Sequence, residues 1–296
     1  MRQAGSPIFA ENSENLAKVL GKMPAIDFDS RVRVTRVVDR RELAAGVVLL
    51  GVHAPEVVRE TRPGQYVMAI PPGGEAPATA LGVYEAHDER ASLMFFVTGR
   101  RTRELSELRP GDRLDLVGPL GNGFDLAAGC ARATIVAGGV GIASVLLAAQ
   151  TLVRSGARVE LLYGARSADL LVDAQRFADE GCELVLATDD GSRGHRGYVT
   201  ELLAQRLPCE AVLACGPTPM LRAVARIAAS AGTAAQLSLE ETFACGVGGC
   251  WGCVVPLRRS SAQAPSFPPA SRGGSDVVYA RICKEGPVFR SDELAW

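Results

Sequence analysis

The sequence has no long apolar run and almost no net charge, and each absence excludes a class of protein. No stretch among the 296 residues reaches the roughly 18 consecutive apolar residues that cross a bilayer, so we expect no membrane-spanning helix. The formal net charge of -1 gives no general electrostatic reason for the chain to bind nucleic acid or an anionic membrane. Residues 1–20 lack a basic segment followed by an apolar stretch and a cleavage site, so we expect no signal peptide and a cytoplasmic protein.

Histidine is also scarce. The chain has three, His53, His87 and His195, which lie far apart in the sequence, and we expect each to be a surface or loop residue rather than a metal ligand. No set of nucleophile, acid and base stands out, so we assign no catalytic side chain. The G-x-G-x-x-G order of the standard dinucleotide fingerprint is missing as well. A function that uses bound cofactors rather than catalytic side chains fits these absences.

What the chain does have is the composition of an ordinary globular protein, with 47% hydrophobic and 22% charged residues. Its length allows two domains or three small ones, at about 150 residues per domain. We treat residues 1–28 as a polar N-terminal extension. Residues 29–128 contain six short runs of alternating or β-branched residues separated by Gly, Pro and Asp, a pattern that predicts a small antiparallel β-barrel.

The pattern changes after this region. An apolar strand at residues 133–137 runs into GGVG and then into a helical stretch, and strands and helices alternate through residues 129–236. This alternation is typical of a doubly wound parallel α/β nucleotide-binding domain. Residues 237–296 contain a group of cysteines and form a small third module. Within it, residues 258–276 are rich in Ser, Pro and Gly, and we expect a disordered loop there.

The turn after the first apolar strand of the α/β region is a candidate phosphate site. Bare backbone amides and the positive end of the following helix would face an anion there, and glycines let phosphates approach closely. The candidate residues are Gly138, Gly139 and Gly141. A tight packing contact without a ligand is the alternative interpretation of such a turn.

Two further stretches lie at the carboxyl ends of predicted strands, where open α/β sheets bind ligands. The second strand lacks the acidic residue that usually holds a ribose hydroxyl, and Arg166 and Ser167 stand there instead. They would contact the adenosine ribose or a 2′-phosphate, so both NAD and NADP stay open. A solvated loop arginine without a ligand is the alternative interpretation of Arg166. Cys215, Gly216 and Pro217 would bring backbone and a small thiol near a flat ring. An ordinary strand-to-helix turn is the alternative for this second stretch.

Cysteines are concentrated near the carboxyl end of the chain. Cys245, Cys250 and Cys253 have the spacing C-x4-C-x2-C, and Cys283 follows in RICKEG. This is the ligand spacing of plant-type [2Fe–2S] ferredoxins. The surrounding glycines suit a loop that winds tightly with its amides pointing inward, which requires positive φ angles. A zinc ribbon, which normally has two C-x2-C pairs, and a disulfide pair are the alternatives. The cysteines that we expect to be ordinary core or surface residues are Cys130, Cys182 and Cys209.

The combination of a nucleotide domain and a candidate cluster implies a third cofactor. A nicotinamide releases two electrons as hydride, whereas a [2Fe–2S] centre accepts one electron at a time. A flavin can split the pair, so we expect a flavin between the two. The antiparallel barrel is the expected place for it.

The order of these modules and several short motifs resemble the electron-transfer subunit of class B dihydroorotate dehydrogenase. The likeness covers about residues 31–296. It extends, less specifically, to the small subunit of NADH-dependent ferredoxin:NADP oxidoreductases and to the wider ferredoxin-reductase superfamily. The motifs that carry it are PGQYV, GPLGNGF, DDGSRGHRGYVT, CGPTPML, SLEETFACGVGGCWGCVVP and CKEGPVF.

The resemblance implies a ferredoxin-reductase-type barrel that binds FAD, an NAD domain and a small C-terminal [2Fe–2S] domain. In that family electrons pass between NAD(H) and FAD, and then through the cluster to the FMN of a separate catalytic subunit that oxidises dihydroorotate. We therefore expect a hetero-oligomer with a flavin-containing partner. The four clustered cysteines match the cluster ligands, and the glycine turn and Cys215 to Pro217 match the nucleotide contacts. The flavin contacts that the resemblance implies are Gly64, Gln65, Tyr66, Gly99 and Thr102.

The chain departs from the family at the flavin-binding stretch. The family reads arginine-proline-apolar-serine there, and this chain has Thr79 to Gly82, without the cation or the hydroxyl. Loss of a charge-assisted contact costs about 1.5–3 kcal/mol. The nearby basic residues that would substitute for the arginine are Arg100, Arg101 and Arg103. The alternative is that this barrel binds flavin weakly or in a different way. The expected loop of residues 258–276 lies beside Cys283, where electrons would leave.

Two other functions remain open at this point. The chain would serve as the small subunit of another complex, such as an NADH-dependent ferredoxin:NADP oxidoreductase. Alternatively it would be a non-catalytic sensor of redox state or nucleotide. A sensor would not pass electrons from NADH to an artificial acceptor.

Overall fold

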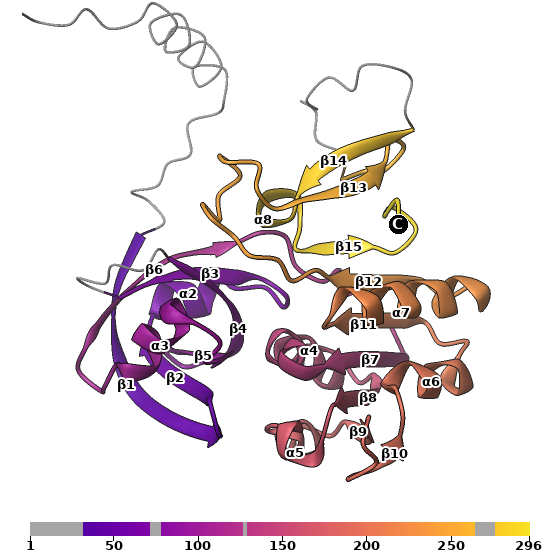
Figure 1. Ribbon diagram of the computed structural model, residues 1–296, viewed down its shortest axis with the longest axis horizontal. Coiled ribbons are helices and arrows are strands. Elements are labelled where there is room, and N and C mark those ends of the chain that lie inside the picture. Colours follow the sequence, from indigo (N-terminus) through magenta and orange to yellow (C-terminus); the bar gives the residue numbers. More distant parts are fainter. Residues whose placement is uncertain (1–31, 72–77, 127–128, 264–275) are drawn as a thin grey trace, which may run out of the picture. The chain divides into compact units, whose positions relative to one another are not determined.

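The computed structural model describes residues 32–71, 78–126, 129–263 and 276–296 (Figure 1). The expected N-terminal extension of residues 1–28 lies outside these ranges, as does most of the expected loop, from residue 264 to residue 275.

The first part of the described chain is a closed antiparallel barrel, as the sequence predicts. Its six strands pair in the order β1-β2-β5-β4-β3-β6. Alternate side chains of the strands fill the interior, and β2 is buried along nearly its whole length. The short helices α2 (Pro55–Glu60) and α3 (Arg100–Glu107) lie in the connections between strands. The strands are β1 (Val32–Ala44), β2 (Val47–His53), β3 (Tyr66–Ile70), β4 (Thr79–His87), β5 (Arg90–Phe96) and β6 (Arg113–Leu120).

The second part is a seven-stranded sheet in the order β10-β9-β8-β7-β11-β12-β15, and the first six of these strands are parallel. This confirms the predicted doubly wound nucleotide-binding fold. The strands are β7 (Arg132–Gly138), β8 (Arg158–Ala165), β9 (Glu183–Thr188), β10 (His195–Arg196), β11 (Ala211–Cys215), β12 (Ala235–Ser238) and β15 (Val288–Arg290).

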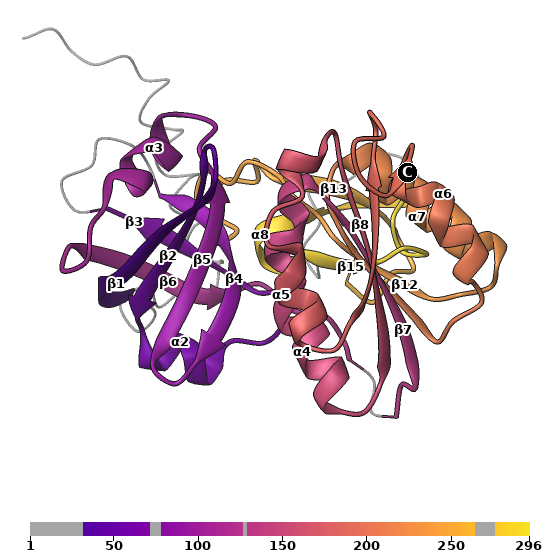
Figure 2. The same ribbon diagram turned by 90° about the horizontal axis from the view of Figure 1, so that it is seen from below.

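Helices cover both faces of this sheet (Figure 2). The helices α4 and α5 pack with Ile135, Leu161 and Leu213 on one face, and α6 and α7 pack with Val136 and Leu162 on the other. Most side chains on both faces of β7 and β8 are apolar, as in a strand that is covered on both sides, and Thr134 and Glu160 are polar exceptions within the two strands. The helices and 3₁₀ turns are η2 (Gly139–Ser144), α4 (Leu146–Arg154), η3 (Ala168–Leu170), α5 (Ala174–Asp179), α6 (Val199–Leu203), η4 (Ala204–Arg206) and α7 (Thr218–Ser230).

The chain reverses its direction across the sheet between β7 and β11. From β7 it adds β8 and β9 on one side, and it then returns to add β11 and β12 on the other. Such a switch point opens a crevice at the carboxyl ends of the two central strands. The backbones are tightly packed there, since a Cβ atom on Gly141 would lie 2.2 Å from the carbonyl oxygen of Cys215.

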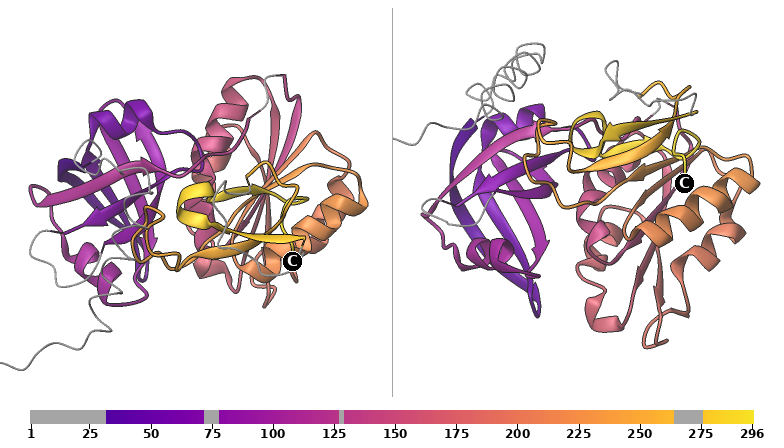
Figure 3. Two further views of the ribbon diagram at one scale, coloured as in Figure 1. Left: turned by 90° about the horizontal axis from the view of Figure 1, so that it is seen from above. Right: turned by 45° about the horizontal axis from the view of Figure 1, so that its top comes forward.

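The C-terminal segment leaves the sheet after β12 and comes back to it. A loop that contains three of the clustered cysteines leads to a hairpin of β13 (Val254–Arg258) and β14 (Val277–Arg281), and α8 (Ile282–Glu285) carries Cys283 (Figure 3). The strand β15 then pairs antiparallel with β12. This last strand is not predicted by the sequence pattern. Within the described ranges, no helix is long and apolar enough to cross a membrane.

Candidate cofactor sites

The cysteine loop between β12 and β13 has no regular secondary structure and turns through left-handed backbone conformations. Gly246 and Gly248 have φ angles of +69° and +83°, as expected for a tightly wound loop. Trp251 adopts φ 58° as well. A Cβ atom on Gly246 would lie 2.3 Å from the sulfur of Met68 in β3, so the loop packs directly on the barrel.

The four clustered thiols lie in two pairs. Cys245 hydrogen-bonds Cys250, and Cys253 hydrogen-bonds Cys283, which comes from α8. Backbone amides also point at the sulfurs, since the amide of Gly252 donates to Cys250 Sγ and that of Cys283 donates to Cys253 Sγ, both at 3.4 Å. No three His, Cys, Asp or Glu side chains converge on one point anywhere in the described part of the chain.

The surroundings favour the thiolate form of one cysteine in each pair. Burial raises the pKa of Cys245, but the amides of Val247, Cys250 and Gly249 outweigh it and lower the pKa to about 7. The hydrogen bond from Cys283 lowers the pKa of Cys253 to about 6, whereas the same bond and burial raise the pKa of Cys283. Thiolates that accept amide hydrogen bonds are the donors through which cysteine binds iron or zinc, so the chemistry of these residues fits a metal site.

A buried arginine stabilises the cysteine loop. Arg281, at the end of β14, is 8% exposed and donates from Nη1 to the carbonyl oxygen of Gly248 at 2.7 Å. Its guanidinium lies 4.5 Å from the ring centroid of Trp251 and forms an ion pair with Glu285. The sequence analysis missed this residue, although the i, i+4 spacing of Arg281 and Glu285 around Cys283 is a local signal.

Tyr66 connects the barrel to both cysteine-bearing segments. Its hydroxyl lies 2.6 Å from the carbonyl oxygen of Gly246 and 2.7 Å from that of Cys283, and its single proton serves one of them at a time. The ring packs against Phe243 with 5.1 Å between centroids. Burial, aided by the nearby cysteines, raises the pKa of Tyr66, so the hydroxyl stays a donor.

A cavity of about 350 Å³ lies between the barrel strands β3, β4 and β5 on one side and η2 and the carboxyl end of β12 on the other. Its walls are mostly apolar, with Leu81, Phe95 and Phe243 among them. The predicted flavin residues that line this cavity are Gly64, Tyr66, Thr79, Gly82 and Thr102.

Two predicted flavin residues do not line this cavity. Gln65 is buried, where it accepts from the amide of Arg62 at 2.8 Å and donates to the carbonyl oxygen of Gly121 at 2.7 Å. Gly99 precedes α3, and its amide donates to Thr102 Oγ1 at 3.2 Å. Both shape the turns that flank the cavity.

A small polar cluster forms one wall of the same cavity. The thiol of Cys215 donates to Glu240 Oε1 at 3.4 Å, and the nearby hydroxyls of Ser144 and Ser238 lower the pKa of this thiol. Burial raises the pKa of both Cys215 and Glu240. Glu240 and Ser144, which line the cavity, were missed by the sequence analysis because only the fold brings the ends of η2, β11 and β12 together.

A second cavity, of about 690 Å³, opens at the carboxyl ends of the parallel strands. Four predicted nucleotide residues line it: Gly138, Gly139, Arg166 and Pro217. Asp189, directly after β9, lines it as well and was not predicted. The predicted residues that lie outside its lining are Gly141, Ser167, Cys215 and Gly216. Phe96, at the end of β5, borders both cavities.

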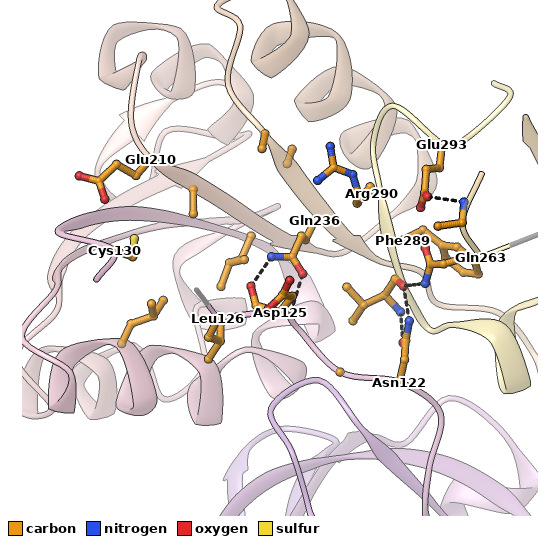
Figure 4. Close-up of a pocket in the computed structure, with 18 of the residues that line it drawn as sticks. Asn122, Asp125, Leu126, Cys130, Glu210, Gln236, Gln263, Phe289, Arg290 and Glu293 are labelled. Carbon is orange, nitrogen blue, oxygen red and sulfur yellow. Dashed lines mark hydrogen bonds between the residues drawn. The ribbon is translucent and has the colours of Figure 1, made fainter. Parts of the chain in front are cut away.

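A third cavity, of about 500 Å³, contains none of the predicted site residues (Figure 4). Its polar side chains already serve the fold. Asn122 donates to the carbonyl oxygen of Val288 at 2.7 Å, and Gln236 exchanges two hydrogen bonds with the backbone of Asp125. These bonds tie the segment that leaves the barrel to β12 and β15.

Comparisons with known proteins agree with this architecture. Residues 135–226 match the family model of the oxidoreductase NAD-binding domain. A solved structure of an NADH-dependent reduced ferredoxin-NADP oxidoreductase aligns with a TM-score of 0.75 and 28% identity over 89% of this chain and 90% of that one. A ferredoxin reductase of carbazole 1,9a-dioxygenase aligns with a TM-score of 0.61 at 22% identity, over 71% of this chain and 68% of that one, which shows the fold.

Two curated relatives that match most of this chain have the same description. The chain is 34% identical to the dihydroorotate dehydrogenase B (NAD(+)) electron transfer subunit of Caldanaerobacter subterraneus subsp. tengcongensis, over 80% of this chain and 88% of that one. It is 30% identical to the subunit of the same name from Desulforamulus reducens, over 89% of this chain and 100% of that one. The chain therefore belongs to the family of dihydroorotate dehydrogenase B electron transfer subunits.

Proposed function

We propose that this chain passes electrons between NAD(H), an FAD in the barrel cavity and a [2Fe–2S] cluster on Cys245, Cys250, Cys253 and Cys283, and so to a flavin-containing catalytic subunit that acts on dihydroorotate. The domain division expected from the sequence, with boundaries near residues 128 and 236, is part of this proposal. Because thiols must stay reduced to receive iron, the proposal places the protein in the cytoplasm.

One observation carries the proposal: the three candidate sites adjoin one another in the order that the electrons would take. Phe96 borders both the nucleotide cavity and the barrel cavity. Tyr66 and Phe243 line the barrel cavity, and the Tyr66 hydroxyl reaches backbone carbonyls beside two of the cysteines. A ligand in the barrel cavity would therefore contact residues of both neighbouring sites.

When bound, a flavin takes two electrons as hydride and releases them singly to a one-electron acceptor. The chain itself binds and excludes water. The apolar walls of the barrel cavity would enclose a flat ring, and the bare turn at Gly138 and Gly139 would receive phosphates of the nucleotide. Glu240, which lines the barrel cavity and accepts from the thiol of Cys215, would face the ligand bound there.

The three arginines that would replace the family's arginine at the flavin site differ in their contacts. Arg100 pairs with Glu104 at 3.3 Å, and Arg103 is exposed. Arg101 is half-buried, and its Nη1 donates at 3.3 Å to the carbonyl oxygen of Phe243, a residue of the cavity wall. We propose that Arg101 replaces the family's arginine toward the FAD pyrophosphate.

The cysteine loop is the proposed exit for electrons. Cys250 is exposed, and Val254 and Tyr279 on the adjoining hairpin are 40% and 50% exposed. A partner that covers this face would bury the cluster and these two apolar side chains together, which favours a stable hetero-oligomer.

The test is cofactor content and electron transfer by anaerobically purified full-length protein. We expect two irons, two sulfides and one FAD per chain, and NADH-driven reduction of ferricyanide. Reconstitution with a candidate catalytic subunit should couple dihydroorotate oxidation to NAD⁺ reduction. Iron with no flavin would refute the barrel assignment, and loaded protein that does not turn over ferricyanide would indicate a sensor.

A second function has support in the structural comparison. The solved NADH-dependent reduced ferredoxin-NADP oxidoreductase aligns over 89% of this chain. Membership in such a complex would use the same three sites with a different partner. NADH-dependent reduction of NADP⁺ by the native complex, without activity on dihydroorotate, would favour it.

A further inference from the structure

The hydroxyl of Ser144 lies directly against Gly82 in the barrel cavity. A Cβ atom added to Gly82 would lie 2.9 Å from Ser144 Oγ, and 3.7 Å from the Cα and Cβ atoms of Ser144. Both residues line the cavity, Gly82 from strand β4 of the barrel and Ser144 from the end of η2. The Ser144 hydroxyl therefore occupies the space that a side chain at position 82 would take.

This hydroxyl belongs to the nucleotide-binding domain, although it lies in the barrel cavity. η2 runs from Gly139 to Ser144 as a 3₁₀ turn directly after the glycine turn. Ser144 is the residue of this turn whose polar side chain reaches the barrel cavity, while the buried Ile142 faces the core of the α4 side of the sheet. The hydroxyl is thus fixed by the same segment that forms the nucleotide turn.

The hydroxyl has capacity for a ligand. It lies near the thiol of Cys215, whose pKa it lowers, and the proton of that thiol is directed to Glu240. A hydroxyl offers one donor and two acceptor positions, so even with one bond to this sulfur it can still bond a ligand. Other polar side chains line the cavity as well, Thr79, Ser238 and Glu240 among them, but Ser144 is the residue that a side chain at position 82 would meet.

We propose that Ser144 hydrogen-bonds the ring of the bound flavin and takes the place of the hydroxyl that the family resemblance implies at the position of Gly82. The proposal rests on the proposed function, since it needs FAD in the barrel cavity. In this arrangement the hydroxyl that bonds the flavin ring comes from the nucleotide-binding domain, at Ser144, and not from the barrel, at position 82. Flavin binding would then depend on how η2 is held, which it would not if the hydroxyl were on β4.

The test compares FAD binding to flavin-stripped full-length protein with the changes Ser144→Ala, Gly82→Ser and both together. The dissociation constant is measured by quenching of flavin fluorescence, and the visible spectrum and midpoint potential of the bound flavin are recorded. Ser155→Ala, at the far end of α4, is the matched control because its hydroxyl bonds only the carbonyl oxygen of Leu152. Thermal unfolding of each variant checks that the fold is retained.

We expect Ser144→Ala to weaken FAD binding about three- to tenfold, the effect of one neutral hydrogen bond, and to shift the flavin spectrum and potential. The double change should bring the affinity back to within about threefold of the original protein, because the space that Ser144 vacates accepts a serine on β4. Gly82→Ser alone should bind no better than the original, since its side chain meets Ser144.

Two results would overturn the proposal. Equal affinity, spectrum and potential for Ser144→Ala and the original protein would show that the hydroxyl makes no contact. Failure of the double change to recover affinity, in a protein with unaltered thermal unfolding, would show that the two positions are not equivalent. If the original protein binds no FAD at all, the proposed function itself is refuted. This result differs from the two above, in which the original protein binds FAD.

Discussion

Removal of the Tyr66 hydroxyl should loosen the cysteine loop from the barrel. The side chain is 4% exposed. Its hydroxyl lies 2.6 Å from the carbonyl oxygen of Gly246, the residue after Cys245, and 2.7 Å from that of Cys283. Tyr66→Phe removes one buried hydrogen bond, a net loss of about 1 kcal/mol, and leaves a buried carbonyl without its donor, which adds about 1 kcal/mol. Opening of the loop should therefore become about thirtyfold more favourable, at about 1.4 kcal/mol per decade.

The rate of iron loss measures this opening. The anaerobic, cluster-loaded protein is mixed with a ferrous chelator and reductant, and colour is followed with time, under conditions in which loop opening precedes chelation. Tyr66→Phe should lose iron about thirtyfold faster than the original protein. Because burial raises the pKa of Tyr66, the hydroxyl stays protonated, and the difference should not change between pH 6 and pH 9.

Tyr279→Phe is the matched control, since this tyrosine is 50% exposed on β14. Its change should leave the rate of iron loss unaltered. Equal rates for Tyr66→Phe and the original protein would refute the view that Tyr66 holds the loop, and would place the resistance to opening in the Arg281 contacts instead.

Three further predictions follow from the described contacts. Arg101→Ala should weaken FAD binding at least tenfold, the loss of one charge-assisted contact, while the exposed Arg103→Ala should not; equal dissociation constants for the two variants would exclude Arg101 as the pyrophosphate ligand. Asp189→Ser should raise the ratio of kcat/KM for NADPH to that for NADH, because a carboxylate in the nucleotide cavity repels a 2′-phosphate, and an unchanged ratio would contradict this placement. In the metal-free chain, iodoacetamide at pH 7.5 should label Cys253 before Cys182, because the pKa of Cys253 is lowered to about 6 and burial raises that of Cys182 to about 11. The rate of labelling at Cys253 should fall as the pH drops below 6. Peptide mass spectrometry measures the labelling of both cysteines.

The two large folds could be predicted from the sequence because each has a strong period. The alternating and β-branched runs of residues 29–128 predict the barrel, and apolar strands separated by helices predict the parallel sheet. The strand β15 could not be predicted, since Val288–Arg290 is three residues long. Its place depends on pairing with β12, which lies about fifty residues earlier in the chain.

The candidate sites divide in the same way. Cysteine spacing and glycine-rich turns are local patterns, so residues such as Cys245 and Gly138 could be found without a structure. Ser144, Glu240 and Asp189 could not, because a single serine or acidic residue after a strand has no local signature. Only the meeting of strand ends at the switch point gives them a role.

The return of β15 to the sheet has a mechanical consequence for the cysteine module. The module is fastened at both ends to one strand, because β12 leads into it and β15, which pairs with β12, leads out of it. A segment clamped in this way cannot swing as an arm between a donor and an acceptor. Electron delivery by this protein should therefore be insensitive to solvent viscosity, and removal of the last strand would unfasten the module from the sheet rather than merely shorten the chain.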